Sequence, residues 1–87
     1  MRHKKVKGGE FVTKVANENV LDREEGKNTV LTNVTIINMS ADRIHVVING
    51  GDELPLDNGE TMTLGDLAID SIVVVESGSK VRYMGVE

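Results

Sequence analysis

The stretch IDSIVVVESGSKVRY, residues 69–83, carries the strongest β-sheet signal in this chain of 87 residues. Its residues 72–75 are four β-branched apolar side chains in a row, which is too short for a helix and typical of a strand buried on both faces. The Ser-Gly-Ser sequence at 77–79 favours a turn, because glycine takes positive φ without strain. Residues 80–83 then alternate polar and apolar. The stretch therefore predicts a hairpin that joins a central strand to a strand nearer the sheet edge.

Five further strands are predicted upstream from alternating or β-branched apolar residues, at 10–14, 29–38, 43–49, 53–56 and 61–64. Asn49-Gly50 is the preferred pair of a type I′ hairpin turn, and residues 57–60 have the same turn chemistry. Pro55 cannot donate to a strand ladder, so its strand is expected at a sheet edge. Gly85 indicates a bulge or a close backbone approach.

The fold predicted from this pattern is all-β: a small single-domain β-sandwich or barrel of about seven short antiparallel strands. Residues 10–87 are expected to form the domain. Residues 15–28 are expected to be a loop, and residues 65–68 a single helical or 3₁₀ turn. In the strand 29–38, alternation assigns four residues to the core face, namely Val30, Thr32, Val34 and Ile36.

Residues 1–9, MRHKKVKGG, are expected to be a flexible basic arm. Its positive charges come from Arg2, Lys4, Lys5 and Lys7. Residues 8–87 hold six basic and fourteen acidic side chains, so their net charge is −8 against +4 for the arm. The arm is either a solvated terminus or a contact for an acidic neighbouring subunit or nucleic acid. The acidic body permits no more than a weak, salt-sensitive contact with nucleic acid, which is not an expected partner.

Composition excludes several classes of site. The chain contains no cysteine, which excludes disulfides, thiolate metal sites and cysteine nucleophiles. Phe11 and Tyr83 are its two aromatic residues, which disfavours the stacking platforms that bind sugars or single-stranded nucleic acid. Its apolar runs are a few residues long, so we expect neither a secretion signal nor a membrane span.

Catalysis is not expected, and neither is a bound cofactor. His45 has no second histidine, cysteine or carboxylate close to it in sequence, which favours a surface or rim position. The acidic residues lie in or beside predicted turns, where aspartate bonds to the backbone. An alternative function is a ligand-binding β module in which these turns hold a cation or face a carbohydrate, through Asp52, Asp57, Glu60 and Asp66.

Self-association fits more of the sequence. Val47, Val73 and Val75 fall on the strand faces opposite the main core. They are expected to form either a second core layer or an oligomer interface. A chain of this size gains stability from buried subunit contacts, and exposed strand edges tend to pair.

The C-terminal half of the chain resembles small β-sandwich modules of phage virion proteins, including head decoration, head-fibre and tail components. The resemblance rests on a progression of turn and core residues, namely Asn38, Ser40, Asn49, Gly50, Leu56, Gly59, Glu60, Ile69, Ser71, Ile72 and Val74. It implies a non-enzymatic structural protein that forms a homo-oligomer and contacts another virion protein, in the virion or in the host cytoplasm.

Overall fold

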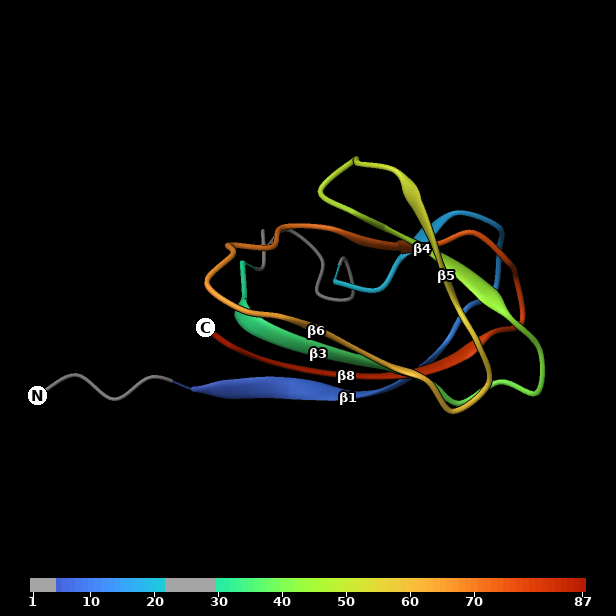
Figure 1. Cartoon of the computed structure of the whole chain (residues 1–87), viewed down its shortest axis with the longest axis horizontal. Coiled ribbons are helices and arrows are strands. Elements are labelled where there is room, and N and C mark those ends of the chain that lie inside the picture. Colours follow the sequence, from blue (N-terminus) through green and yellow to red (C-terminus); the bar gives the residue numbers. More distant parts are fainter. Residues whose placement is uncertain (1–4, 22–29) are drawn as a thin grey trace, which may run out of the picture.

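The computed structural model describes residues 5–21 and 30–87, and within these ranges the chain forms strands and no helix (Figure 1). The strands are β1 (Val6–Val12), β2 (Glu18–Asn19), β3 (Thr32–Asn38), β4 (Ile44–Ile48), β5 (Glu53–Leu56), β6 (Thr61–Leu64), β7 (Ile72–Val74) and β8 (Lys80–Val86). They form two four-stranded antiparallel sheets with the orders β1-β8-β3-β6 and β2-β7-β4-β5. The prediction of a small all-β sandwich or barrel of about seven strands is confirmed in its fold class: the fold is a sandwich, and it has eight strands.

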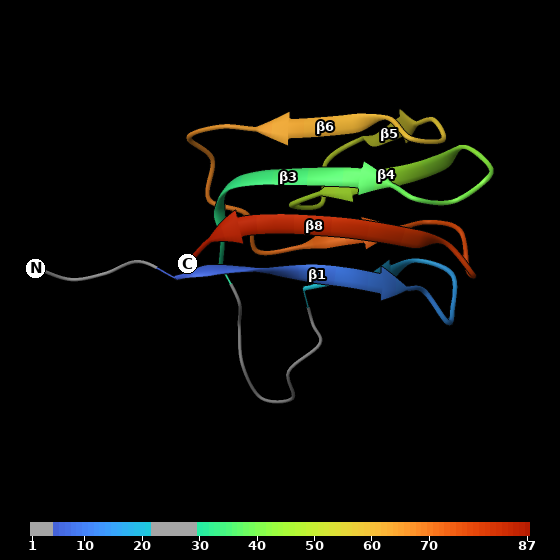
Figure 2. The same ribbon diagram turned by 90° about the horizontal axis from the view of Figure 1, so that it is seen from below.

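The strand order follows a simple rule. β4 pairs with β5, β3 with β6, β2 with β7 and β1 with β8. The chain is therefore arranged as one long hairpin with its tip at β4–β5, rolled up so that successive pairs alternate between the two sheets (Figure 2). This arrangement of eight strands is a jelly roll.

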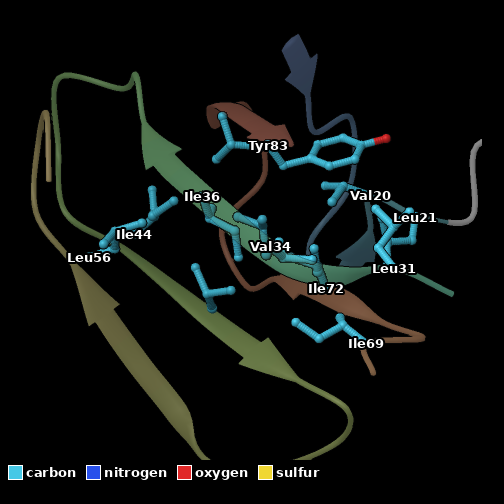
Figure 3. Close-up of a cluster of buried hydrophobic side chains, with 13 residues drawn as sticks. Val20, Leu21, Leu31, Val34, Ile36, Ile44, Leu56, Ile69, Ile72 and Tyr83 are labelled. Carbon is cyan, nitrogen blue, oxygen red and sulfur yellow. The ribbon is translucent and has the colours of Figure 1, made fainter. Parts of the chain in front are cut away.

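The core lies between the sheets and is aliphatic except for Tyr83 (Figure 3). Its buried members are Val20, Leu21, Leu31, Val34, Ile36, Ile44, Val46, Leu56, Ile69, Ile72, Val74, Val81 and Tyr83. Met62 and Leu64 of β6 pack against this cluster from the sheet edge, as their alternation predicts. Burying one such aliphatic side chain stabilises the fold by about 1.5–3 kcal/mol.

The hairpin predicted at 69–83 does not form, because its two strands lie in different sheets. β7 pairs with β2 and β4, whereas β8 pairs with β1 and β3, so β8 is central and not near an edge. The turn between them is tied to Thr13, whose carbonyl oxygen accepts a 2.8 Å hydrogen bond from the Gly78 N–H. The same turn residues can connect two strands of one sheet or two strands of different sheets. Here the turn connects different sheets, and its contact with Thr13, more than 60 residues away, holds it in that arrangement.

A bulge in β3 changes which residues face the core. Asn33 has φ of 52°, and the pairing of β3 with β8 shifts register between Thr32 and Thr35. The extra residue brings Leu31 and Val34 to the same face. Leu31 is fully buried and Val30 is 47% exposed, so the assignment of Val30 to the core face is wrong.

Three segment boundaries also differ from expectation. β1 begins at Val6, inside the predicted arm, because β8 extends to Val86 and offers a backbone partner along that whole length. Gly8 permits the close pairing, since a Cβ there would overlap the carbonyl oxygen of Tyr83. Of the segment expected to be a loop, residues 15–21 are described and contain the short strand β2, whereas residues 22–28 lie outside the described residues. Residues 65–68 form no helical turn.

The turn predicted at residues 57–60 forms, with the Glu60 N–H donating to the Asp57 carbonyl oxygen at 2.9 Å. Of its two central residues only Gly59 has positive φ, and the turn joins strands of different sheets, so its likeness to a type I′ hairpin turn is wrong.

The predictions for Asn49-Gly50 and Pro55 are confirmed. Asn49 and Gly50 have φ of 51° and 72°, and the Gly51 N–H donates to the Ile48 carbonyl oxygen at 2.9 Å, as in a type I′ turn. Strand β5, which contains Pro55, lies at a sheet edge.

The first and last described residues lie side by side. Val6 pairs with Val86, and the Glu87 N–H donates to the Lys5 carbonyl oxygen at 2.8 Å.

Candidate interaction surfaces

The outer face of the sheet β2-β7-β4-β5 carries a small apolar surface. Val47 and Val73 are directly paired across β4 and β7. Val75 follows one step along, where its N–H donates to the His45 carbonyl oxygen at 3.0 Å. The three side chains are half-buried and lie outside the buried core cluster. The structure therefore brings these three predicted residues together, and we call them the valine patch.

Polar residues border the valine patch. Asn19 of β2 pairs with Val73 on one side, and Glu53 of β5 pairs with Val47 on the other. Directly paired residues of an antiparallel sheet share a face. The valine patch thus has an apolar centre and polar edges, as is common in protein–protein interfaces.

His45 and Glu76 close one end of the valine patch. The His45 Nδ1 and Glu76 Oε2 atoms are 2.6 Å apart, and the His45 backbone N–H donates to Glu76 Oε1 at 2.8 Å. Burial by itself raises the pKa of the Glu76 carboxyl, but these hydrogen bonds from His45 outweigh it and hold the pKa below its usual value. His45 lies on the outer face as predicted. Its partner is 31 residues away, so no local pattern indicated it.

Two of the four carboxylates predicted for a cation site, those of Asp57 and Glu60, are engaged in local bonds. Asp57 Oδ1 accepts a 2.5 Å hydrogen bond from Arg43 Nε, which lowers the pKa of the Asp57 carboxyl. Glu60 Oε1 accepts the backbone N–H of Asp57 at 3.0 Å. Asp66 has φ of 52° and donates its N–H to Asn33 Oδ1. Across residues 5–21 and 30–87, no three acidic, histidine or cysteine side chains converge as metal ligands would.

The predicted arm falls partly outside the described residues, which do not include Arg2 and Lys4. Lys5 precedes β1 and Lys7 belongs to it, both exposed. The acidic residue of β1, Glu10, bonds to Arg82 at 2.7 Å and lies 3.6 Å from Lys80. The hydrogen bond from Arg82, with the charge of Lys80, lowers the pKa of the Glu10 carboxyl.

A second exposed apolar surface, which the sequence did not indicate, lies along β1 and β8. Val6, Val12 and Met84 are 67%, 53% and 54% exposed. A shallow depression of about 260 Å³ lies among residues of the two strands, namely Val6, Lys7, Gly8, Gly9, Arg82, Tyr83 and Met84. The two consecutive glycines contribute no side chains to fill it. The sequence predicts these glycines at the end of a flexible arm, whereas the structure places them within β1.

The described part of the chain contains no helix of the length and apolar character needed to cross a membrane. Comparisons with protein-family models, curated proteins and solved structures found no match to this chain.

Proposed function

We propose that this protein is a non-enzymatic structural or protein-interaction module that forms a homo-oligomer. The observation that carries the proposal is the valine patch, an apolar surface with polar borders on the outside of a sheet. A charged or hydroxylated residue is the ordinary occupant of an outward-facing strand position. Three neighbouring valines at such positions favour burial against another protein surface.

The size of the chain supports self-association. A domain of 87 residues buries a smaller fraction of its surface than a larger domain does, so its stability is modest. Each Å² of apolar surface removed from water contributes about 25 cal/mol. Association of copies through the valine patch involves folded chains and not unfolded ones, so it increases the free energy of unfolding.

We further propose a phage virion, head or tail, as the setting in which the oligomer assembles, with another virion protein as a second partner. The support is the resemblance of the C-terminal half to small virion β-sandwich modules, together with the jelly-roll order, which recurs in viral capsid domains. The same order occurs in lectins and cupins, so the fold by itself does not select the virion.

The test is the solution mass of the protein by light scattering behind a sizing column, at low salt and at about 1 M salt, where the Debye length falls to about 3 Å. We expect a discrete oligomer that persists at high salt, because an apolar contact is not screened. Val73→Lys should convert it to smaller species. Thr63→Lys, at an exposed outward position of β6 in the other sheet, is the matched control and should leave the mass unchanged.

A monomer at high protein concentration would contradict the proposal. So would equal loss of mass in both variants, because the association would then not depend on the valine patch.

A further inference from the structure

The four strands at the sheet edges differ in how well they are protected against pairing with another strand. β2 has two residues, β6 has four, and β5 has four with Pro55 among them. Short edge strands and proline are common means of preventing edge-to-edge association. β1 has seven residues, no proline and an almost fully exposed surface. Among the described residues, β8 is the strand paired with β1, so the other edge of β1 has no strand beside it (Figure 2).

The backbone groups on the free edge of β1 can be assigned from the bonds on the other edge. The Lys5 carbonyl oxygen accepts a hydrogen bond from the Glu87 N–H. At the other end of β1, the Thr13 N–H donates to the Ser79 carbonyl oxygen and the Thr13 carbonyl oxygen accepts from the Gly78 N–H, just before β8. Successive residues of an antiparallel strand direct these groups to alternate edges. The odd-numbered residues of β1 therefore bond toward β8. The groups of four even-numbered residues face outward, namely Val6, Gly8, Glu10 and Val12.

We propose that β1 pairs antiparallel with β1 of a second copy around a two-fold axis at Gly9, which joins the two β1-β8-β3-β6 sheets into one. Gly9 is the middle residue of Val6–Val12, so this register uses the whole strand. Val6 then lies opposite the partner's Val12, and Gly8 opposite the partner's Glu10. Each outward-facing pair exchanges two hydrogen bonds, which gives about eight between the copies.

Neighbouring registers fit less well. In the joined sheet, the core-facing sides of both copies must lie on the same face, and the outward-facing backbone groups must meet. The residue opposite a given residue can therefore change only in steps of two. A centre at Gly8 places Val6 opposite the partner's Glu10. A centre at Glu10 places two carboxylates directly opposite each other, which is unfavourable. The centre at Gly9 instead pairs the two most exposed valines of the strand, at 67% and 53% exposure, twice.

The other contacts of this register are also favourable. Gly9 lies opposite its own copy, in the narrow kind of pair where Cα atoms approach to about 4.5 Å. Lys7 lies opposite the partner's Phe11, and the aliphatic part of a lysine packs well on such a side chain while its ammonium group stays in water. The depression at Val6, Gly8 and Met84 lies beside the position of the partner's Val12 and offers it apolar surface.

This pairing goes beyond the proposed function, because it uses β1 of one sheet and not the valine patch of the other. The two proposals can fail separately.

The test uses single cysteines, since the chain has none of its own. Val6→Cys and Val12→Cys are made as separate variants at exposed positions. In the proposed register, residue 6 of one copy and residue 12 of the other are about 5.5 Å apart at Cα, within disulfide range. Identical positions in the two copies are about 20 Å apart along the strands. Mild oxidation of the mixture should therefore give a covalent dimer at least about tenfold faster than oxidation of either variant by itself.

Absent cross-linking in the mixture, or equal rates in the single variants, would overturn the pairing. A mixture of Val6→Cys with Thr63→Cys is the control, because β6 is at the far edge of the sheet, and it should not cross-link. Repeating the main experiment with Val73→Lys in both chains separates the proposals. If cross-linking persists in the Val73→Lys background, β1 pairing does not depend on the valine patch and the proposal is supported. If cross-linking is lost, the proposal that β1 pairs independently of the valine patch is overturned.

A measurement on the unaltered protein guards against misfolding of the variants. Hydrogen exchange should show the outward amides of Gly8 and Glu10 protected at high protein concentration and unprotected after dilution. Exchange rates that do not depend on concentration would overturn the proposal.

Discussion

The side chain of Asn38 is fully buried and bonded at each polar atom. Its Nδ2 donates to the carbonyl oxygens of Asp42 and Leu56 at 2.9 and 2.8 Å, and its Oδ1 accepts the Ser40 N–H at 2.8 Å. One amide thus joins the end of β3 to the following turn and to β5 in the opposite sheet. The structure gives Asn38 a physical role in fixing where the chain crosses between sheets.

Replacing Asn38 should therefore be costly. In Asn38→Ala three backbone groups lose their partner, among them the Leu56 carbonyl oxygen in a buried bond, and we expect a loss of about 3 kcal/mol in the free energy of unfolding, measured with urea. Asn58→Ala is the matched control, because Asn58 also bonds to this turn, at the Ser40 carbonyl oxygen, but is exposed. Its loss should stay below about 1 kcal/mol. Equal losses would show that the burial of Asn38 is unimportant.

The His45–Glu76 contact predicts a pH dependence. The pKa of Glu76 is lower in the folded protein than in the unfolded chain, so the stabilisation is fully present above the usual glutamate pKa of about 4.3. It is lost as the pH falls through the lowered folded-state value. Glu76→Gln should reduce the urea midpoint at pH 7, and its difference from the natural protein should shrink as the pH falls below the usual glutamate range and vanish once the Glu76 carboxyl is protonated in the folded protein. Adding His45→Gln should cause little further change, because the partner is already lost. Additive losses would contradict a direct interaction.

Packing between elements depends on small residues at specific places, and Gly85 of β8 is one of them. A Cβ at this position would lie 2.9 Å from Val34 Cγ2 and 3.0 Å from Leu31 Cβ. The bulge in β3 presses these two core side chains against the backbone of β8. The sequence predicted a bulge or a close backbone approach at Gly85, and the atoms that lie against it belong to the side chains of Val34 and Leu31.

Gly85→Ala should destabilise the protein by about 1–3 kcal/mol, because the added methyl group has no space in the core. Gly65→Ala is the control, since the nearest atom to its new Cβ would be Asn33 Oδ1 at 4.0 Å. Thermal and urea unfolding of both variants should show a lower midpoint for Gly85→Ala alone. An unchanged midpoint would mean that β3 and β8 can separate at no cost.

Local elements differed in how far the sequence predicted them. The β4–β5 hairpin followed from Asn49-Gly50, because both residues accept the positive φ that this turn needs. The prediction that β7 and β8 form a hairpin was wrong, because turn residues do not determine which strands pair. The pairing of β7 and β8 depends on Thr13 and on residues of other strands. The start of β1 was missed because Gly8 and Gly9 suggest flexibility in isolation, whereas Gly8 is required beside Tyr83.

At the level of the whole molecule, self-association should make thermal stability depend on protein concentration. Binding between folded copies favours the folded state by mass action, so Tm should rise between about 1 and 100 µM protein. Val73→Lys should reduce this dependence, and Thr63→Lys should preserve it. A Tm that is independent of concentration in the natural protein would contradict association in this range.

The global arrangement was predictable only in part. Alternation placed Val47, Val73 and Val75 opposite the core, and it therefore identified the members of the valine patch. Their direct contact depends on the pairing of β4 with β7, which are separated by two strands in sequence. The edge position of β1 among the described strands could not be predicted, because edge positions follow from the rolled topology and not from any one segment.

The side-by-side placement of the first and last described residues has a consequence for how this domain connects to other chains. With Val6 paired to Val86, a polypeptide that enters at one terminus and leaves at the other passes through a single point of the molecule. The domain can therefore be inserted within a loop of a host protein without separating the two ends of that loop. For the same reason, a circularly permuted chain opened at Asn49-Gly50 needs only a short linker between Lys5 and Glu87. The permuted chain should form the same strand pairs, although β4 and β5 are no longer joined directly.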